Sequence, residues 1–387
     1  MKSRHIKIKN TKIKWITVFT CLALFGNLTS ESYALDVSAK SAILICADSC
    51  CTVWSKNETE PLPMASTTKI MTSILALEHA AAYGNKEVEI TPQMIRVEGT
   101  SMGLMQGDIV TLDSLAKGMM LCSGNDAANA AAIAVGGETE KFISLMNEKA
   151  KMLGMKNTKF STPSGLDKDN HHSTAQDMAI LGAYAMENEN FSKIVSQKSM
   201  PVKFINPSKT VHLKNHNKLL RLYPHCTGIK TGFTKLAGRC LVSSAQKDGI
   251  KLICVTLNAP NDWDDHISLY NFGFENTVLK NFDDKSFDSV VKVEGGTKNE
   301  VKVGSVSDFS VSLKKGQENN ATREVQLQES HTAPVEKGQI LGKVVYSIDN
   351  QKIGENDIIA LEEVPKIKNE KTGFFKSILK FFSGIFS

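Results

Sequence analysis

The amino-acid sequence predicts a mixed α/β (α+β) fold, in which helices flank an antiparallel sheet and a small all-β domain follows at the C-terminal end. Three observations lead to this prediction. An apolar, strand-like segment at residues 41–53 precedes a series of helical patterns, β-branched runs return between residues 229 and 257, and short alternating strands fill residues 290–362. The sheet of the first domain is therefore expected to draw its strands from both ends of that domain. With 387 residues, the chain is long enough for two domains.

The helical part of the first domain is expected between residues 66 and 187. Ile70, Ile74 and Leu77 recur at helical spacing and Gly84 is a typical helix stop, which predicts a helix over residues 66–83. Further helices are expected at residues 112–120, 126–135, 140–153 and 175–187.

The remaining elements of the first domain are strands at 229–231, 240–245 and 252–257 and a helix at 264–272. We assign residues 35–280 to this domain. Near Phe282 the composition changes to short alternating strands separated by Gly, Asn and Lys turns, and we assign residues 285–365 to a small β-rich domain.

The N-terminal segment, residues 1–34, has the pattern of a secretory signal peptide. A cationic start precedes an apolar run over residues 15–25, and Ser32 and Ala34 are the small residues that a signal peptidase requires. The run is too short to span a bilayer, which needs roughly 20 residues, although an uncleaved anchor is an alternative. Residues 1–34 contain six Lys or Arg and one Glu, so they account for the whole net charge of +5. The remainder is near neutral and has no basic stripe, which argues against nucleic-acid binding.

The cysteine pattern indicates free thiols. Seven cysteines follow the signal segment, an odd number that does not fit a disulfide framework in an exported chain. No C-x-x-C pair occurs, and His171-His172 is the only His doublet, so no metal site is expected.

The last segment, residues 366–387, predicts an amphipathic membrane-anchor helix. Phenylalanine, leucine and isoleucine recur at three- and four-residue steps from Phe374 to Phe386, and Lys376 and Lys380 lie on the opposite face. Such a helix spans only about 20 Å, so it would lie in the membrane surface. Docking of this helix on the protein itself is the alternative.

The first motif with chemical potential is Ser66-Thr67-Thr68-Lys69, at the start of the first predicted helix. Residues three apart share a helical face, so the Lys69 amine can reach the Ser66 hydroxyl. A serine needs a base to become a good nucleophile, and a lysine can act as that base only if its pKa is lowered. This motif alone is weak, because S-x-x-K often arises by chance.

Two further motifs follow in the chain. Ser123-Gly124-Asn125 lies in a turn between two predicted helices, where a hydroxyl and a carboxamide can hold a base and orient a substrate amide; a simple helix N-cap is the alternative. Lys230-Thr231-Gly232 lies on a predicted strand, which can pair with an extended substrate while Gly232 permits its close approach.

Together the three motifs resemble those of the penicillin-binding proteins and class A β-lactamases. Longer segments resemble, more specifically, the low-molecular-mass penicillin-binding proteins that are serine-type D-alanyl-D-alanine carboxypeptidases. These segments are residues 62–72, 101–104, 123–129 and 228–234. The resemblance covers roughly residues 38–365, and it implies a penicillin-binding/β-lactamase-like fold for the first domain.

The resemblance implies a role for each motif residue. Ser66 attacks the carbonyl between the two D-alanines with Lys69 as general base, and Ser123 and Lys230 assist proton transfer to the leaving D-alanine. Substrate binding falls to Asn125, Lys230, Thr231, Gly232 and Phe233, and the backbone N–H groups of Ser66 and Phe233 form the oxyanion hole.

The same resemblance implies the partners. These are a peptidoglycan stem peptide ending in D-Ala-D-Ala, β-lactam antibiotics as covalent inhibitors, and the membrane surface through the C-terminal helix, with no metal or organic cofactor. The expected location is outside a bacterial cell, at the outer face of the cytoplasmic membrane and the cell wall.

Two departures from the family pattern bear on the substrate carboxylate. Thr227 stands where many relatives have Asp, and the arginine that many relatives place after the following strand is missing. His266 is the nearest candidate there and is expected to be structural, which leaves Lys230, Thr231 and Arg239.

Two rival functions are considered. A class A-like β-lactamase would need a glutamate that activates the deacylating water, and no Glu-x-x-Leu-Asn pattern occurs. A non-catalytic cell-wall-binding homologue would keep the scaffold, but here every motif residue is present.

Overall fold

The structure is a computed structural model that describes residues 35–168, 170–348 and 350–367. The predicted signal peptide at 1–34, and all but the first two residues of the predicted anchor helix at 366–387, lie outside the described residues. No helix among the described residues is long and apolar enough to cross a membrane.

The first domain is built on a five-stranded antiparallel sheet with the strand order β2-β1-β9-β8-β7. Its strands are β1 (Ser41–Cys46), β2 (Thr52–Lys56), β7 (Cys226–Thr234), β8 (Gly238–Lys247) and β9 (Ile250–Leu257). Because β1 pairs with β9, the sheet joins the two ends of the domain, as predicted. Every residue of β1 is buried, which is typical of a strand covered on both faces.

The N-terminal strand prediction was wrong in one respect. The segment at 41–53 does not form one strand, because the chain reverses between β1 and β2 and the two pair as a hairpin. Cys50 in the turn has a positive φ of 55°, a conformation that a continuous strand does not contain.

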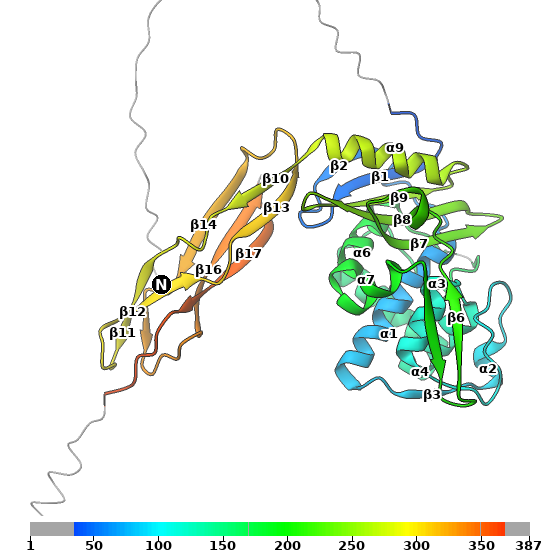
Figure 1. Ribbon diagram of the computed structural model, residues 1–387, viewed down its shortest axis with the longest axis horizontal. Helices are drawn as coiled ribbons and strands as arrows, with labels where there is room; N and C mark the ends of the chain where they lie inside the picture. Colours follow the sequence, from blue (N-terminus) through cyan, green and yellow to red (C-terminus); the bar gives the residue numbers. More distant parts are fainter. Residues whose placement is uncertain (1–34, 169, 349, 368–387) are drawn as a thin grey trace, which may run out of the picture. The chain divides into compact units, whose positions relative to one another are not determined.

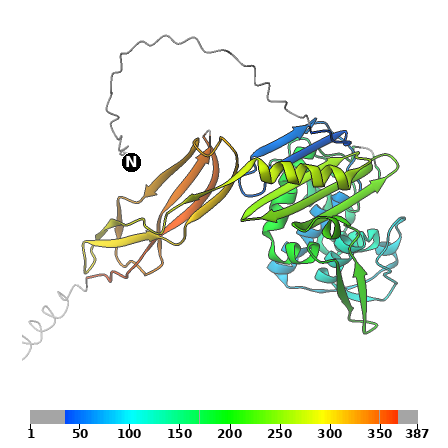
Figure 2. The same ribbon diagram turned by 45° about the horizontal axis from the view of Figure 1, so that its top comes forward.

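Helices cover both faces of this sheet (Figures 1 and 2). The described helices of the domain are α1 (Lys69–Tyr83), α2 (Pro92–Ile95), α3 (Leu112–Leu121), α4 (Asn125–Gly136), α5 (Thr139–Met152), α6 (Ala175–Glu187), α7 (Glu189–Val195), α8 (Leu219–Leu222) and α9 (Asp262–Glu275). Gly182 of α6 lies against Ile253, whereas Gly273 of α9 lies against Leu252. Neighbouring residues of a strand point to opposite faces, so α6 and α9 cover opposite sides of the sheet.

Three small elements complete the first domain. A 3-10 turn, η1 (Ala65–Thr68), leads directly into α1. Two hairpins pair β3 (Glu87–Glu89) with β4 (Ile109–Thr111) and β5 (Ser199–Phe204) with β6 (Lys209–Lys214).

The C-terminal domain is all β within the described residues, which confirms the prediction. Six strands form one sheet in the order β14-β16-β17-β12-β11-β15, and β10 pairs with β13. The strands are β10 (Thr277–Phe282), β11 (Ser289–Glu294), β12 (Glu300–Ser305), β13 (Phe309–Lys314), β14 (Ala321–Leu327), β15 (Ser330–Thr332), β16 (Ile340–Ile348) and β17 (Gln351–Ala360).

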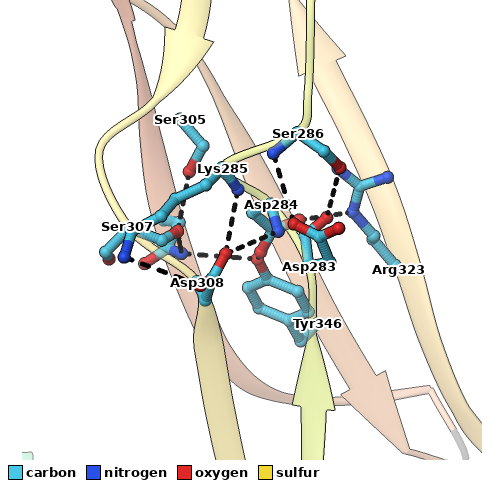
Figure 3. Close-up of polar contacts among 10 residues, drawn as sticks. Asp283, Asp284, Lys285, Ser286, Ser305, Ser307, Asp308, Arg323 and Tyr346 are labelled. Atoms are coloured by element: carbon cyan, nitrogen blue, oxygen red, sulfur yellow. Dashed lines mark hydrogen bonds and ion pairs between the residues drawn. The ribbon is translucent and has the colours of Figure 1, made fainter.

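A buried ionic cluster stabilises this domain (Figure 3). The fully buried Asp284 accepts hydrogen bonds from the Arg323 guanidinium, at 2.7 Å, and from the Tyr346 hydroxyl. Tyr346 in turn stacks on Phe309, with ring centroids 3.9 Å apart. The carboxylate is therefore paired inside an otherwise apolar interior, as a buried charge must be.

Candidate active site

The centre of the site is the pair Ser66 and Lys69, at the junction of η1 and α1. The Lys69 amine donates a 2.8 Å hydrogen bond to the Ser66 hydroxyl and a 2.6 Å hydrogen bond to the carbonyl oxygen of Ser164. Lys69 is fully buried. The three-residue spacing read from the sequence therefore places the amine against the hydroxyl, although the residues between them form a 3-10 turn.

Burial controls the charge of both motif lysines. Desolvation, and then the charge of Lys230, lower the pKa of Lys69 well below its usual value of 10.5. Desolvation also lowers the pKa of Lys230 to about 7. The lowered pKa of Lys69 favours its neutral amine, which is the form that can accept the proton of Ser66.

The second motif lies between α3 and α4. Ser123 is buried and has a positive φ of 63°, and its carbonyl oxygen accepts a 2.6 Å hydrogen bond from Thr100. Asn125 is held by its Nδ2 atom, which donates a 2.7 Å hydrogen bond to the carbonyl oxygen of Glu98. Its Oδ1 atom is buried without a hydrogen-bond partner among the described residues. The N-cap alternative does not apply, because Gly124 caps α4 and no side chain accepts a capping hydrogen bond there.

The third motif lies on β7, the edge strand of the sheet. Lys230 is buried and donates a 2.8 Å hydrogen bond to the carbonyl oxygen of Thr231. A Cβ atom at Gly232 would lie 3.0 Å from the Met64 carbonyl oxygen and 3.1 Å from the Ser66 nitrogen. Glycine thus lets β7 approach the turn that carries Ser66.

One pocket, with a volume of about 590 Å³, brings these motifs together. Ser66, Ser123, Thr231, Gly232 and Phe233 line it. The other three predicted site residues are buried and do not line it; they are Lys69, Asn125 and Lys230. Lys69 reaches the pocket through its hydrogen bond to Ser66, which lines it.

Arg239 and His266 are the two residues that could replace the missing arginine in binding the substrate carboxylate, and only Arg239 lines the pocket. Arg239 lines the pocket, where its Nε and Nη2 atoms donate to one oxygen of Asp262 at 3.0 and 2.5 Å, and its guanidinium lies 5.4 Å from the Trp263 ring centroid. His266 is fully buried, bonded to Ser243 and Thr256, and does not line the pocket. The sequence interpretation of His266 as a structural residue agrees with this placement.

Sequence reasoning missed two supports of the site. The buried Asp126 accepts hydrogen bonds from the Ser101 hydroxyl and from the backbone N–H groups of Met102, Gly103 and Leu104, at 2.6–3.1 Å. It thereby ties the loop 101–104 to the helix that follows Ser123. Both segments were noticed in the sequence, but nothing in their spacing indicated that they touch.

The second missed support is His171. Its Nδ1 atom accepts a 3.0 Å hydrogen bond from the Ser161 N–H, so the Nε2 atom carries the proton and donates to the Thr68 hydroxyl at 2.8 Å. Thr68 donates in turn to the Ala65 carbonyl oxygen at 2.8 Å. Burial lowers the pKa of His171 to about 4, so the ring stays neutral and fixes the turn on which Ser66 lies.

We searched the described part of the chain for groups of metal-ligating side chains and for disulfide bonds. No group of three or more His, Cys, Asp or Glu side chains there is placed to hold a metal ion. The seven described cysteines are free thiols.

Comparisons with known proteins agree with this geometry. The family profile described as D-alanyl-D-alanine carboxypeptidase matches residues 27–261, and that of the penicillin-binding protein 5 C-terminal domain matches residues 274–366. The chain is 33% identical to the D-alanyl-D-alanine carboxypeptidase DacF of Bacillus subtilis over 88% of this chain and 89% of that protein. It is 32% identical to DacC of Escherichia coli over 95% of this chain and 92% of that protein.

A solved structure matches this chain over most of its length. Penicillin-binding protein 5 of Haemophilus influenzae superimposes with a TM-score of 0.63 at 29% identity, over 86% of this chain and 98% of that chain. The matched profile covers more than half of the sequence, and the relatives extend over nearly all of it. The chain therefore belongs to the D-alanyl-D-alanine carboxypeptidase family.

Proposed function

We propose that this protein is a serine-type D-alanyl-D-alanine carboxypeptidase, which binds penicillin and removes the terminal D-alanine of peptidoglycan stem peptides through an acyl-enzyme on Ser66. The observation that carries the proposal is the 2.8 Å hydrogen bond from a desolvated lysine, Lys69, to a serine that lines an open pocket. A neutral amine in that position is the base that a serine nucleophile requires.

In the acylation step, the neutral Lys69 amine takes the Ser66 proton while the Ser66 oxygen attacks the carbonyl carbon between the two D-alanines. The backbone N–H groups of Ser66 and Phe233 receive the oxyanion. When the carbon–nitrogen bond breaks, the proton held by Lys69 passes by way of Ser123, with the assistance of Lys230, to the nitrogen of the leaving D-alanine, and Lys69 returns to the neutral amine. Water then hydrolyses the ester with Lys69 again as base, which frees the shortened peptide.

The terminal carboxylate of the substrate is held by Thr231, Lys230 and Arg239 in this proposal. Arg239 compensates for the arginine that this chain lacks after β9. Asp262 and the Trp263 ring fix the guanidinium in the pocket, and its unused N–H groups can bind a carboxylate. Asn125 positions the peptide with its unpartnered Oδ1 atom, which can accept a substrate N–H.

A β-lactamase is the weaker assignment because the described residues that line the pocket include no free carboxylate that could activate water for rapid deacylation of a penicilloyl ester. Among the described residues that line it, the only carboxylate is Asp262, which is ion-paired to Arg239. A covalent penicilloyl ester on Ser66 should therefore persist rather than turn over rapidly.

The test is a digest of diacetyl-Lys-D-Ala-D-Ala followed by mass spectrometry, with the wild type beside Ser66→Ala. We expect D-alanine release by the wild type and none by the variant. Labelled penicillin should remain attached to the wild type and not to the variant. Rapid release of hydrolysed penicillin would favour the β-lactamase, and a failure of Ser66 to take up the label would favour the non-catalytic homologue.

For the location, we propose export through the signal peptide at 1–34 and attachment to the outer face of the cytoplasmic membrane by the helix at 366–387. Support comes from the sequence patterns of both segments. Lys366, Lys368 and Lys371 add attraction to anionic lipid, roughly 1 kcal/mol each. Cosedimentation with anionic vesicles tests the anchor: binding should be lost in an Ile378→Asp, Phe382→Asp variant, and binding equal to wild type would contradict it.

A further inference from the structure

One part of the pocket lining is a row of cationic side chains on the segment between β6 and α8. Over residues 214–218 the chain alternates between exposed and buried positions: Lys214, His216 and Lys218 are exposed, whereas Asn215 and Asn217 are buried. Period-two alternation sends alternate side chains to opposite sides of an extended segment. Lys214, His216 and Lys218 all line the pocket that contains Ser66, and so does the buried Asn215 between them.

The buried asparagines fasten this segment to the domain. The Asn215 Nδ2 atom donates to the carbonyl oxygens of Val195 and Gln197, at 3.2 and 3.0 Å, and its Oδ1 atom accepts from the Asn217 N–H at 2.9 Å. The Asn217 Oδ1 atom accepts from the Leu219 N–H at 3.1 Å. The side-chain amides of Asn215 and Asn217 therefore fix the backbone of the segment that carries the cationic side chains.

The next helix adds a fourth side chain. In α8, Leu219 and Leu220 are buried, whereas Arg221 is exposed and lines the same pocket. We call Lys214, Lys218 and Arg221 the cationic ridge. His216 is left out because partial desolvation and the Lys230 charge lower its pKa.

The cationic ridge has no counter-charge within the described residues. None of its three side chains forms an ion pair there with a carboxylate. The one described carboxylate that lines the pocket, Asp262, is already paired with Arg239. Three unpaired cations that face one pocket favour a ligand with negative charge at that wall.

We propose that the cationic ridge binds a second carboxylate of the donor peptide, on the residue just before D-Ala-D-Ala, and so selects peptides with a free acid at that position. The inference rests on the proposed function, because it extends the peptide from the Ser66 end of the pocket. The proposed function assigns the terminal carboxylate to Thr231, Lys230 and Arg239, which leaves the cations of the ridge for another acidic group of the peptide. An amidated or neutral side chain would leave the cations unpaired.

The experiment compares two matched substrates. One is N-acetyl-L-2-aminoadipyl-D-Ala-D-Ala, whose side chain ends in a carboxylate, and the other is its side-chain amide. D-alanine release is followed at several substrate concentrations to obtain kcat/KM for each. A charge-assisted hydrogen bond gained by the acid predicts a preference of about tenfold over the amide at low salt, and that preference should shrink as salt is added.

Variants locate the selection. In Lys218→Gln and in Arg221→Gln, the ratio of kcat/KM for acid over amide should fall towards one. Lys203→Gln is the control: it removes the same charge from an exposed lysine of the β5–β6 hairpin that does not line the pocket, and it should keep the wild-type ratio.

The outcomes separate this inference from the function on which it rests. Equal kcat/KM for the two peptides in the wild type overturns the inference while leaving the carboxypeptidase intact. A ratio that falls equally in Lys203→Gln assigns the preference to overall charge and also overturns it. No D-alanine release from either peptide would instead remove the proposed function itself.

Discussion

The two motif lysines, Lys69 and Lys230, are both buried, and burial disfavours the charged form of each. Burial lowers the pKa of Lys69 and of Lys230, and the charge of Lys230 lowers that of Lys69 further. The two lysines also differ in their contacts: the Lys69 amine lies against the Ser66 hydroxyl, where its neutral form can act as a base, whereas the Lys230 amine is bonded to the Thr231 carbonyl and titrates at about pH 7. Chemically identical side chains thus take different roles because of their surroundings.

This difference predicts a bell-shaped pH dependence. Below its pKa, Lys69 is protonated and cannot accept the Ser66 proton, so kcat/KM rises with pH through that pKa. Above about pH 7, Lys230 loses its charge in the free enzyme, so kcat/KM should fall there. A bound carboxylate favours the ammonium form, so the alkaline limb of kcat should lie at higher pH than that of kcat/KM.

The measurement is a pair of pH profiles for D-alanine release. Lys230→Arg is the matched variant, since a guanidinium does not titrate in this range. Its residual kcat/KM should lack the alkaline limb near pH 7. An unchanged limb in this variant would show that another group titrates there.

At the scale of elements, the position of the Ser66 turn depends on the loop that packs against it. Gly165 has a positive φ of 84°, and a Cβ atom there would lie 1.9 Å from the Ala65 carbonyl oxygen. The preceding residue, Ser164, provides the carbonyl that holds the Lys69 amine. Close contact between this loop and η1 is therefore part of the lysine environment.

Gly165→Ala should disturb both stability and acylation. The methyl group cannot fit without moving backbone, so we expect a loss of about 3 kcal/mol or more in the free energy of unfolding, and labelling of Ser66 by penicillin slowed about tenfold or more. Gly154→Ala is the control: its φ is 77°, but no atom lies within 4 Å of the added methyl. It should cost only about 1 kcal/mol of backbone strain and leave labelling unchanged. Equal losses in both variants would refute the role of close packing at Gly165.

At the scale of the whole molecule, the proposed catalytic residues and the buried Asp284 cluster belong to different domains. Asp284 pairs with Arg323 and Tyr346 inside the β-rich domain, where the described residues line no part of the Ser66 pocket. Stability of the β-rich domain and chemistry at Ser66 should therefore respond to different substitutions.

Asp284→Asn tests this separation. At this fully buried position the substitution removes the charged acceptor of the Tyr346 and Arg323 hydrogen bonds and brings an amide donor against those two donors. We therefore expect a loss of about 2 kcal/mol in unfolding free energy, measured by denaturant titration. Penicillin labelling of Ser66 at a temperature well below unfolding should match the wild type. Glu355→Gln, at an exposed ion pair with Lys343 and Lys352, is the control and should not shift the unfolding midpoint. A loss of labelling in Asp284→Asn under native conditions would contradict the separation.

Much of the fold could be predicted because its signals are local. The helix predicted at 175–187 has those same bounds in the structure, since Thr174 accepts a capping hydrogen bond from the Asp177 N–H and the apolar residues follow helical spacing. The β7–β9 strands were likewise found from β-branched runs, although each extends beyond the predicted core. The turn between β1 and β2 was missed because it is short. Only Asp48, Ser49 and Cys50 separate two runs that both have strand character, so the two runs were interpreted as one strand.

The sequence by itself determined the order of elements and the three motifs, because periodicity, caps and S-x-x-K spacing depend on residues close together in the chain. Only the tertiary structure decided that the pKa of Lys69 is lowered and that the Ser164 carbonyl accepts a hydrogen bond from its amine. The same is true of the hydrogen bond by which His171 supports the Ser66 turn, and of the position of the cationic ridge in the pocket lining. Each of these depends on burial and on contacts between distant segments. Desolvation of an ammonium group depends on all the protein atoms that replace water around it, and these atoms come from segments far apart in the sequence.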